Sequence, residues 1–251
     1  MTKTLVFANQ KGGVGKTTSA VNVAAGLVRQ GGKRVLLVDM DPQANATFAL
    51  TGKEFPDANM YQVLKEECTI DEVMMETGEP GLTLAPSDIE LSGAEVELIQ
   101  AVGGQQRLRS ALDGVDYDYI VIDAPPSLGF LTVNALAASD AVIIPVDCGV
   151  FSLRGLLKLE DTVERVKQHF GHRLKVMGVV CTLYDHTKVA RDIVQAIQQR
   201  YGELAFDTYI PKNIALEEAH SRAQHIFSYA PSSSGAEAYD KLVQEVMNRG
   251  E

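Results

Sequence analysis

The chain has 251 residues, of which 45% are hydrophobic, and its 33 acidic residues outnumber 23 lysines and arginines to give a formal net charge of −10 at pH 7. A chain of this length and composition can bury a substantial core, which favours a single domain spanning residues 1–251. No apolar run approaches the roughly 20 residues that cross a membrane, and no charged and apolar leader precedes the first predicted strand, so we expect a cytoplasmic protein.

Short β-rich apolar runs alternate with helical patterns along the chain, which is typical of βαβ units and a parallel sheet. Right-handed crossovers should place helices on both faces, giving an α/β, Rossmann-like fold with a mostly parallel twisted sheet. Residues 16–29 have helical spacing, and we expect this helix to stop at Gly31-Gly32 with a left-handed cap. Residues 52–80 predict short helices and loops beside the sheet. The predicted strands are residues 4–8, 34–38, 82–85, 119–123, 141–146, 175–181 and 208–210.

The first predicted strand runs into a glycine loop that ends in Lys-Thr-Thr. Gly12, Gly13 and Gly15 can adopt backbone angles that clash with a side chain, so consecutive amides can turn inward on an anion. Lys16 adds a positive charge at the start of the next helix, and Thr17 is placed to ligate Mg²⁺. The sequence therefore predicts a phosphate site.

This loop departs from the standard phosphate-loop pattern at two positions. Gln10 stands where the pattern has its first glycine, and a second lysine, Lys11, precedes the glycines. In this form residues 11–18 resemble the deviant Walker A box of the ParA/MinD group of ATPases. The resemblance implies that Lys11 reaches across an ATP-sandwich homodimer to the phosphates held by the other subunit. It implies nucleotide contacts from Lys11, Gly12, Gly13, Val14, Gly15, Lys16, Thr17 and Thr18.

Two further motifs place carboxylates at the C-terminal ends of predicted strands, beside the first loop. The run from Asp39 to Gln43 resembles the family's Asp-x-Asp-Pro-Gln switch, which implies that Asp41 activates the attacking water and that Asp39 supports the metal shell. The run from 119 to 127 looks like a Walker B strand with a second switch, which implies that Asp123 holds Mg²⁺ through water. Two lysines, Mg²⁺ and a positioned carboxylate suffice for phosphoryl transfer, so the catalytic candidates are Asp41, Lys11 and Lys16.

The resemblance extends over nearly the whole chain. Residues 209–213 resemble the family's adenine-contacting turn, which implies nucleotide contacts from Pro211 and Asn213. Residues 234–239 resemble its usual entry to the last helix. The last helix is mixed in charge, and we expect its apolar Leu242, Val243 and Val246 to pack on the domain.

Several branches of the group differ in what the ATPase acts on. MinD-type members end in a basic amphipathic helix that binds lipid, and we expect no such C-terminal extension here. The nitrogenase iron-protein branch bridges a cluster with two cysteines per chain, but Cys68, Cys148 and Cys181 are scattered and we expect buried, reduced thiols. ATP-dependent ligases such as dethiobiotin synthetase lack the paired-lysine loop. We also expect no N-terminal helix-turn-helix domain, which leaves the short partition branch.

Partition ATPases of this kind bind DNA without sequence preference as ATP-bound dimers, and an acidic chain opposes that binding. Residues 1–150 hold 10 Lys+Arg and 20 Asp+Glu, whereas residues 151–225 hold 11 and 9. Family members often have more arginines after the turn at Pro211, where this chain has Lys212, Ala215 and His220. The candidate DNA contacts are Arg154, Lys158, Lys188, Arg191, Lys212 and Arg222.

The resemblance thus implies a ParA/Soj-type ATPase that uses ATP and Mg²⁺ for chromosome or plasmid partitioning. Its ATP-bound homodimer is expected on nucleoid DNA, and a centromere-bound ParB-type partner is expected to stimulate slow basal hydrolysis. A related alternative keeps the same cycle but positions a protein cargo, such as a carboxysome or chemoreceptor cluster. A MinD-like membrane-associated positioning factor and a metabolic ATP-dependent ligase are further alternatives.

Overall fold

The computed structural model describes residues 2–53, 56–149, 152–170 and 174–250, without side chains for 152–155. In the described residues eight strands form one sheet in the order β3-β4-β2-β5-β1-β6-β7-β8. All neighbouring strands run parallel except the pair β3 and β4. The strands are β1 (Lys3–Phe7), β2 (Val35–Asp39), β3 (Met75–Glu76), β4 (Leu82–Ala85), β5 (Tyr119–Asp123), β6 (Ala141–Asp147), β7 (Lys175–Tyr184) and β8 (Ala205–Pro211).

All seven predicted strands are present, and their ends lie within three residues of the predicted ends. The interpretation of residues 52–80 was incomplete, because Met75–Glu76 joins the sheet as the antiparallel edge strand β3. A strand of two residues has too few side chains to show an alternating pattern, so periodicity does not detect it. The mostly parallel α/β sheet predicted from the sequence is confirmed.

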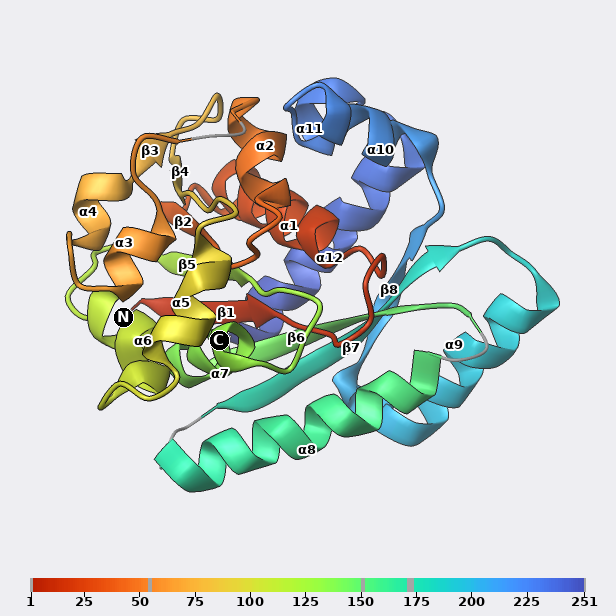
Figure 1. Ribbon diagram of the computed structural model, residues 1–251. Coiled ribbons are helices and arrows are strands. Elements are labelled where there is room, and N and C mark those ends of the chain that lie inside the picture. The colour runs from red at the N-terminus through yellow and green to blue at the C-terminus, as the bar shows by residue number, and fades with distance from the viewer. Residues whose placement is uncertain (1, 54–55, 150–151, 171–173, 251) are drawn as a thin grey trace.

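Helices cover both faces of this sheet (Figure 1). The helices are α1 (Lys16–Gly31), α2 (Asn45–Thr51), α3 (Met60–Leu64), α4 (Ile70–Val73), α5 (Leu91–Leu98), α6 (Arg107–Ala111), α7 (Phe130–Ala138), α8 (Ser152–Phe170), α9 (Lys188–Tyr201), α10 (Ile214–Ser221), α11 (Ile226–Tyr229) and α12 (Ser234–Gly250), with short 3₁₀ turns at Gly104–Gln106 and Gly202–Leu204.

Alternate side chains of the central strands enter two separate hydrophobic cores. On β1, Leu5 and Phe7 pack with α1, α2 and α10 to α12, whereas Val6 faces the core formed with α3 to α9. This division follows from the period of two in a strand, and it explains why buried strands read as continuous apolar runs. The two cores fix the sheet between helices and hold its C-terminal edge in place.

The ends of the long helices follow the sequence signals. Gly32 caps α1 in a left-handed conformation, with φ 57° and ψ 31°, as predicted from Gly31-Gly32. On α12 the side chains of Leu242, Val243 and Val246 are buried, as expected.

The described helices include none with the length and apolar character that a membrane span requires.

Close contact between α1 and α12 yields a stability test. A Cβ atom at Gly26 would lie 2.5 Å from Cγ2 of Val243, so Gly26→Ala should overpack this contact and lower the free energy of unfolding by about 1–3 kcal/mol. Urea denaturation measures this change. Gly93→Ala on α5 is the matched control, because its Cβ comes no closer than 3.5 Å to other atoms. Val243→Ala should partly restore the Gly26→Ala protein; full stability of Gly26→Ala alone would contradict the proposed clash.

Candidate nucleotide-binding site

The loop between β1 and α1 is held by hydrogen bonds to β6 and β7. Asn9 donates from Nδ2 to the Pro145 carbonyl at 2.7 Å, and its Oδ1 accepts the Lys11 amide at 3.0 Å. Thr182 donates from Oγ1 to the Val14 carbonyl at 2.9 Å. These contacts join residues 136 and 168 positions apart, so the loop is fixed by tertiary structure. Sequence reasoning missed both Asn9 and Thr182.

The same loop leaves the start of α1 open to an anion. Gly13 and Gly15 have φ values of 71° and 76°, which only glycine adopts without strain. Gly15 is the N-cap of α1, and no side chain caps the helix there. The first amides of α1 therefore point outward with the positive end of the helix dipole, as in an anion site.

A pocket of about 300 Å³ opens at this helix end. Lys16 lines it and is only 6% exposed, with Nζ 3.4 Å from the Lys11 carbonyl oxygen. Burial lowers the pKa of Lys16, and the nearby carboxylates of Asp123 and Asp41 partly offset that effect. The lining residues are Gly12, Gly13, Gly15, Lys16, Thr17, Thr18, Asp41, Gln43, Asn45, Pro126 and His220.

Two buried carboxylates lie side by side beneath this pocket. Asp39 and Asp123 end β2 and β5 and are partners in the strand register. Asp39 accepts hydrogen bonds from the Thr47 amide and hydroxyl, both at 2.8 Å, and from the Asp41 amide at 3.1 Å. Burial nevertheless raises the pKa of Asp39 to about 6. Two adjacent buried carboxylates repel each other when ionised, so a cation bound at this edge of the sheet would stabilise both.

A cation would stabilise Asp123 more than Asp39, because Asp123 has fewer hydrogen-bond donors. Both of its carboxylate oxygens are buried and accept no hydrogen bond of good geometry within the described part of the chain. Burial and the neighbouring Asp39 raise the pKa of Asp123, while Thr17 and Lys16 lie close enough to act in the opposite direction. A buried carboxylate without donors beside a threonine hydroxyl offers the hard oxygen ligands that Mg²⁺ prefers. The residues present therefore fit the predicted metal.

The predicted catalytic carboxylate borders the phosphate pocket. Asp41 is 5% exposed, and its Oδ1 accepts the Gln43 amide at 3.0 Å, which orients the carboxylate at the pocket wall. His220 and Asn45 line the same pocket from α10 and α2. The sequence singled out His220 only as a departure from the family's turn, and burial lowers the pKa of this imidazole.

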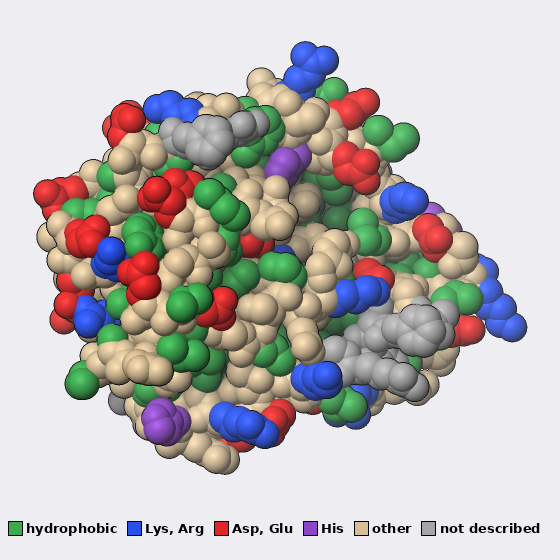
Figure 2. Space-filling model, in the orientation of Figure 1, with side chains coloured by type: hydrophobic (Ala, Val, Ile, Leu, Met, Phe, Trp, Pro, Cys, Tyr) green, Lys and Arg blue, Asp and Glu red, His purple; other side chains and the backbone are tan. Residues whose placement is uncertain are grey.

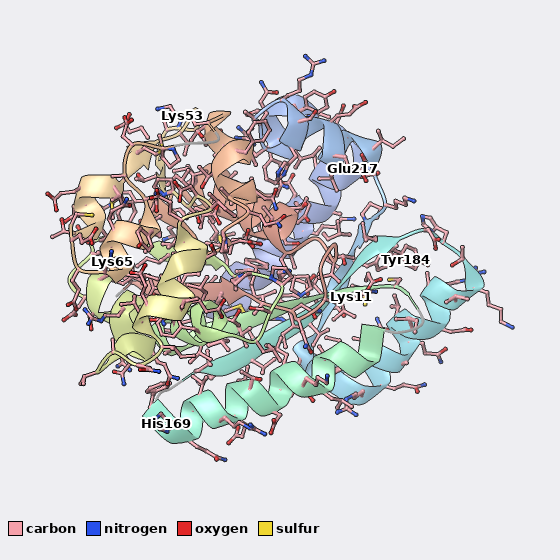
Figure 3. All side chains as sticks on the ribbon, in the orientation of Figure 1. Lys11, Lys53, Lys65, His169, Tyr184 and Glu217 are labelled. Atoms are coloured by element: carbon pink, nitrogen blue, oxygen red, sulfur yellow. The ribbon has the colours of Figure 1, made fainter. Side chains whose placement is uncertain are left out.

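Lys11 lies at the rim of the loop instead of in the pocket (Figure 3). Its Nζ forms an ion pair with Asp147 Oδ2 at 2.7 Å, and the two side chains are 43% and 17% exposed. Asp147 ends β6, beside the strand that carries Thr182. The two lysines of the loop therefore differ: Lys16 faces the chain's own phosphate pocket, and Lys11 is held outside it.

A second pocket, of about 200 Å³, continues from the phosphate pocket and shares Gly13, Gly15 and Thr18 with it. Pro211 and Asn213, predicted to contact adenine, line this second pocket. The Asn213 amide is fixed, because Nδ2 donates to Ser234 Oγ at 2.8 Å and Oδ1 accepts the Ala215 amide at 2.8 Å. The two joined pockets run along the end of α1 and suit a nucleoside with its phosphates.

The predicted DNA contacts are only partly brought together. Lys188 and Lys212 flank the turn after β7, where the Lys212 amide donates to the Tyr184 carbonyl at 2.9 Å, and Arg191 lies one helical turn beyond Lys188. Lys158 and Arg222 are exposed on other elements, α8 and the end of α10. The side chain of Arg154 lies outside the described residues.

Charge is divided over the visible face of the molecule (Figure 2). Acidic side chains gather on the left, over α3 and α4, whereas lysine and arginine side chains are prominent on the right, over α9 and the ends of β7 and β8. The basic region is therefore separate from the acidic excess that dominates residues 1–150.

Comparisons with known proteins agree with this site. A sequence profile described as an AAA domain matches residues 2–176. The sporulation initiation inhibitor protein Soj of Bacillus subtilis (strain 168) is 43% identical over 255 residues, covering 100% of both chains. The chromosome partitioning protein ParA of Caulobacter vibrioides (strain NA1000 / CB15N) is 40% identical over 253 residues, covering 98% of this chain and 94% of ParA.

A solved structure supports the same relationship. The crystal structure of cobyrinic acid a,c-diamide synthase from Mycobacterium smegmatis, with bound ADP and magnesium, has a TM-score of 0.86 and 36% sequence identity. The match covers 100% of this chain and 96% of that one. Together with the two full-length relatives, it shows that this chain belongs to the ParA/Soj family of P-loop ATPases, as residues 11–18 indicated.

Proposed function

We propose that this protein is a partition ATPase whose two copies enclose ATP and Mg²⁺ and then bind DNA without sequence preference. The observation that carries the proposal is the different placement of the two loop lysines. Lys16 is buried in the phosphate pocket of its own chain, whereas the Lys11 ammonium lies at the exposed rim. A lysine at the rim is available to phosphates held by a facing copy.

Thr17, Asp39 and Asp123 are the residues that would hold Mg²⁺, directly or through water, and the bound ion would supply positive charge to the phosphates. Lys16 would add a fixed positive charge to the same phosphates. Asp41 orients a water molecule and accepts its proton as the water oxygen bonds to the γ-phosphorus and the bond from that phosphorus to the bridging oxygen breaks, which releases ADP and phosphate. Related solved structures with bound ADP or an ATP analogue and magnesium support the choice of cofactors.

The proposed cycle places the ATP-bound dimer on nucleoid DNA in the cytoplasm. Lys188, Arg191 and Lys212 supply phosphate contacts from the turns that follow β7 and β8, and a ParB-type partner stimulates the slow hydrolysis that releases the dimer. The name of one full-length relative, the chromosome partitioning protein ParA of Caulobacter vibrioides, supports a chromosome or plasmid as cargo. The same ATPase cycle can position a protein assembly, because the ATPase itself recognises neither the cargo nor a DNA sequence.

Substitution of each loop lysine separates their roles. Lys16→Ala removes a buried charge from the phosphates and should weaken MgATP binding about tenfold or more. Lys11→Ala should leave the affinity of the monomer nearly unchanged but abolish the ATP-dependent dimer. Calorimetry measures the first effect, and light scattering in an Asp41→Ala background measures the second. Equal loss of nucleotide affinity in both variants would contradict the rim role of Lys11.

Asp147 should compete with the facing copy for Lys11. Asp147→Asn removes the ion pair at the rim, and a partly exposed pair of this kind contributes about 0.2–1 kcal/mol. Because a dimer breaks two such pairs, the ATP-bound dimer should form at about twofold to thirtyfold lower protein concentration, as sedimentation can measure. Asp192→Asn, which changes an exposed carboxylate on α9, is the control. Weaker dimerisation of Asp147→Asn would mean that Asp147 prepares Lys11 for the partner instead.

Retention on random-sequence duplex DNA tests the function as a whole. Asp41→Ala protein should bind DNA with ATP and not with ADP, and binding should fall steeply with salt. Adding Lys212→Ala should flatten the plot of log affinity against log salt by about one unit. Lys53→Ala, on a distant exposed lysine, should leave the slope unchanged (Figure 3). ATP turnover that needs a small substrate and ignores DNA would favour a ligase.

A further inference from the structure

The helix α10 presents one face to both pockets of the candidate site. Asn213, its N-cap, lines the second pocket, and so do Leu216 and Glu217 in the first turn of the helix. His220, one turn further on, lines the phosphate pocket. Positions spaced by three or four residues lie on the same side of a helix, so one rigid element borders both pockets.

His220 also contacts the backbone of a neighbouring element. α10 packs against α2, and a Cβ atom at Gly52, the C-cap of α2, would lie 3.4 Å from Cβ of Ala223. At the other end of α2, the His220 imidazole is in hydrogen-bond contact with the backbone of Asn45, the first residue of that helix. Burial lowers the pKa of His220, whereas this contact raises it, so the ring N–H is the donor and the Asn45 carbonyl is the acceptor.

The loop that leads into Asn45 has a strained shape. Ala44 has a φ of 53°, a left-handed conformation that costs free energy in residues other than glycine and persists only where surrounding contacts maintain it. Asp41 accepts the Gln43 amide on Oδ1 at 3.0 Å and the Ala44 amide on its carbonyl oxygen at 2.8 Å. Both of these bonds lie inside the loop, whereas the His220 contact joins the end of the loop to α10.

The same loop carries the carboxylate on which hydrolysis depends in the proposed mechanism. Asp41, Gln43 and Asn45 line the phosphate pocket together. A general base acts only within hydrogen-bond reach of the water that it deprotonates, so a small shift of the loop lowers the rate. The α1 amides and Lys16, which face the phosphates, do not move with this loop. A contact that holds the loop therefore bears on turnover more than on nucleotide affinity.

We propose that His220 is a positioning residue that ties α10 to the loop carrying Asp41 and so keeps this carboxylate within reach of the attacking water. The tie itself can be tested without nucleotide. Its effect on turnover rests on the proposed function, because that effect requires hydrolysis with Asp41 as the base.

Hydrogen exchange in the nucleotide-free protein tests the tie. The amides of Gln43 and Ala44 both bind Asp41, so their exchange rates report whether the loop keeps its shape. His220→Phe retains a ring but removes the N–H donor, and it should speed exchange of these two amides about fivefold. Ser221→Ala on the same helix is the matched control, because the exposed Ser221 hydroxyl donates to the Glu218 carbonyl within α10 at 2.8 Å.

Turnover separates positioning from direct contact with the nucleotide. His220→Phe should lower kcat about fivefold, which corresponds to the loss of one hydrogen bond. MgATP affinity, measured by calorimetry in an Asp41→Ala background, should stay within twofold. His220→Asn and His220→Gln place an amide donor near the positions of ring Nδ1 and Nε2, so one of them should restore at least half of the wild-type kcat. Packing alone does not predict this rescue, because phenylalanine retains more of the ring volume.

Three results would overturn the positioning role. Exchange rates and kcat at wild-type values in His220→Phe would show that the ring does not hold the loop. Equal losses of MgATP affinity and kcat would place His220 on the nucleotide itself. Asn and Gln variants that are both as slow as His220→Phe would show that the N–H donor has no part in the effect.

Failure of the proposed function has a different signature. Wild-type protein that hydrolyses no ATP under any condition would refute the ATPase cycle. The exchange rates of Gln43 and Ala44 would still decide whether His220 holds the loop, because they are measured without nucleotide.

Discussion

The site depends on carboxylates that the fold forces together at the buried C-terminal edge of the sheet. The β2 and β5 register aligns Asp39 with Asp123, and neither side chain has any exposure to solvent. With Asp41 they make three acidic groups near one buried ammonium, Lys16, so full ionisation leaves two uncompensated negative charges. Without a divalent cation, protonation of a carboxylate costs less free energy than burying its charge. Burial accordingly raises the pKa of both Asp39 and Asp123. A bound Mg²⁺ would supply the missing two charges, which would couple its affinity to the ionised state of Asp39 and Asp123.

Rigid support of the loop complements this electrostatic constraint. The amides at the start of α1 can bind phosphate only if the loop keeps its shape before the ligand arrives. Asn9 and Thr182 provide that shape by joining the loop to the ends of β6 and β7. The same strand ends carry Asp147, which holds Lys11. One edge of the sheet thus fixes the phosphate loop and also positions the lysine that the proposed dimer needs.

Local patterns in the sequence predicted most of the fold and the chemical core of the site. The apolar runs located seven strands, and the loop from Lys11 to Thr18 located the phosphate pocket, because both signals lie within a few consecutive residues. The sequence could not reveal that Asn9 meets Pro145 or that Thr182 meets Val14, since these contacts depend on which strands become neighbours. The cysteines show the same limit. Cys148 and Cys181 are buried, as expected, and their thiols lie in hydrogen-bond contact, whereas Cys68 is only partly buried, contrary to expectation.

The distribution of charge reconciles an acidic chain with the proposed binding of DNA. A uniform net charge of −10 would repel phosphate, but the fold gathers acidic side chains over α3, α4 and α5 and leaves lysines at the ends of β7 and β8. Screening in physiological salt limits each patch to about 8 Å, so the two regions act on different partners almost independently. In the proposed function, the basic surface therefore contacts nucleic acid without opposition from the distant acidic surface. On the acidic side, Glu95 of α5 accepts the amide of Phe130, the first residue of α7, so this side of the molecule is joined to the loop that follows Asp123.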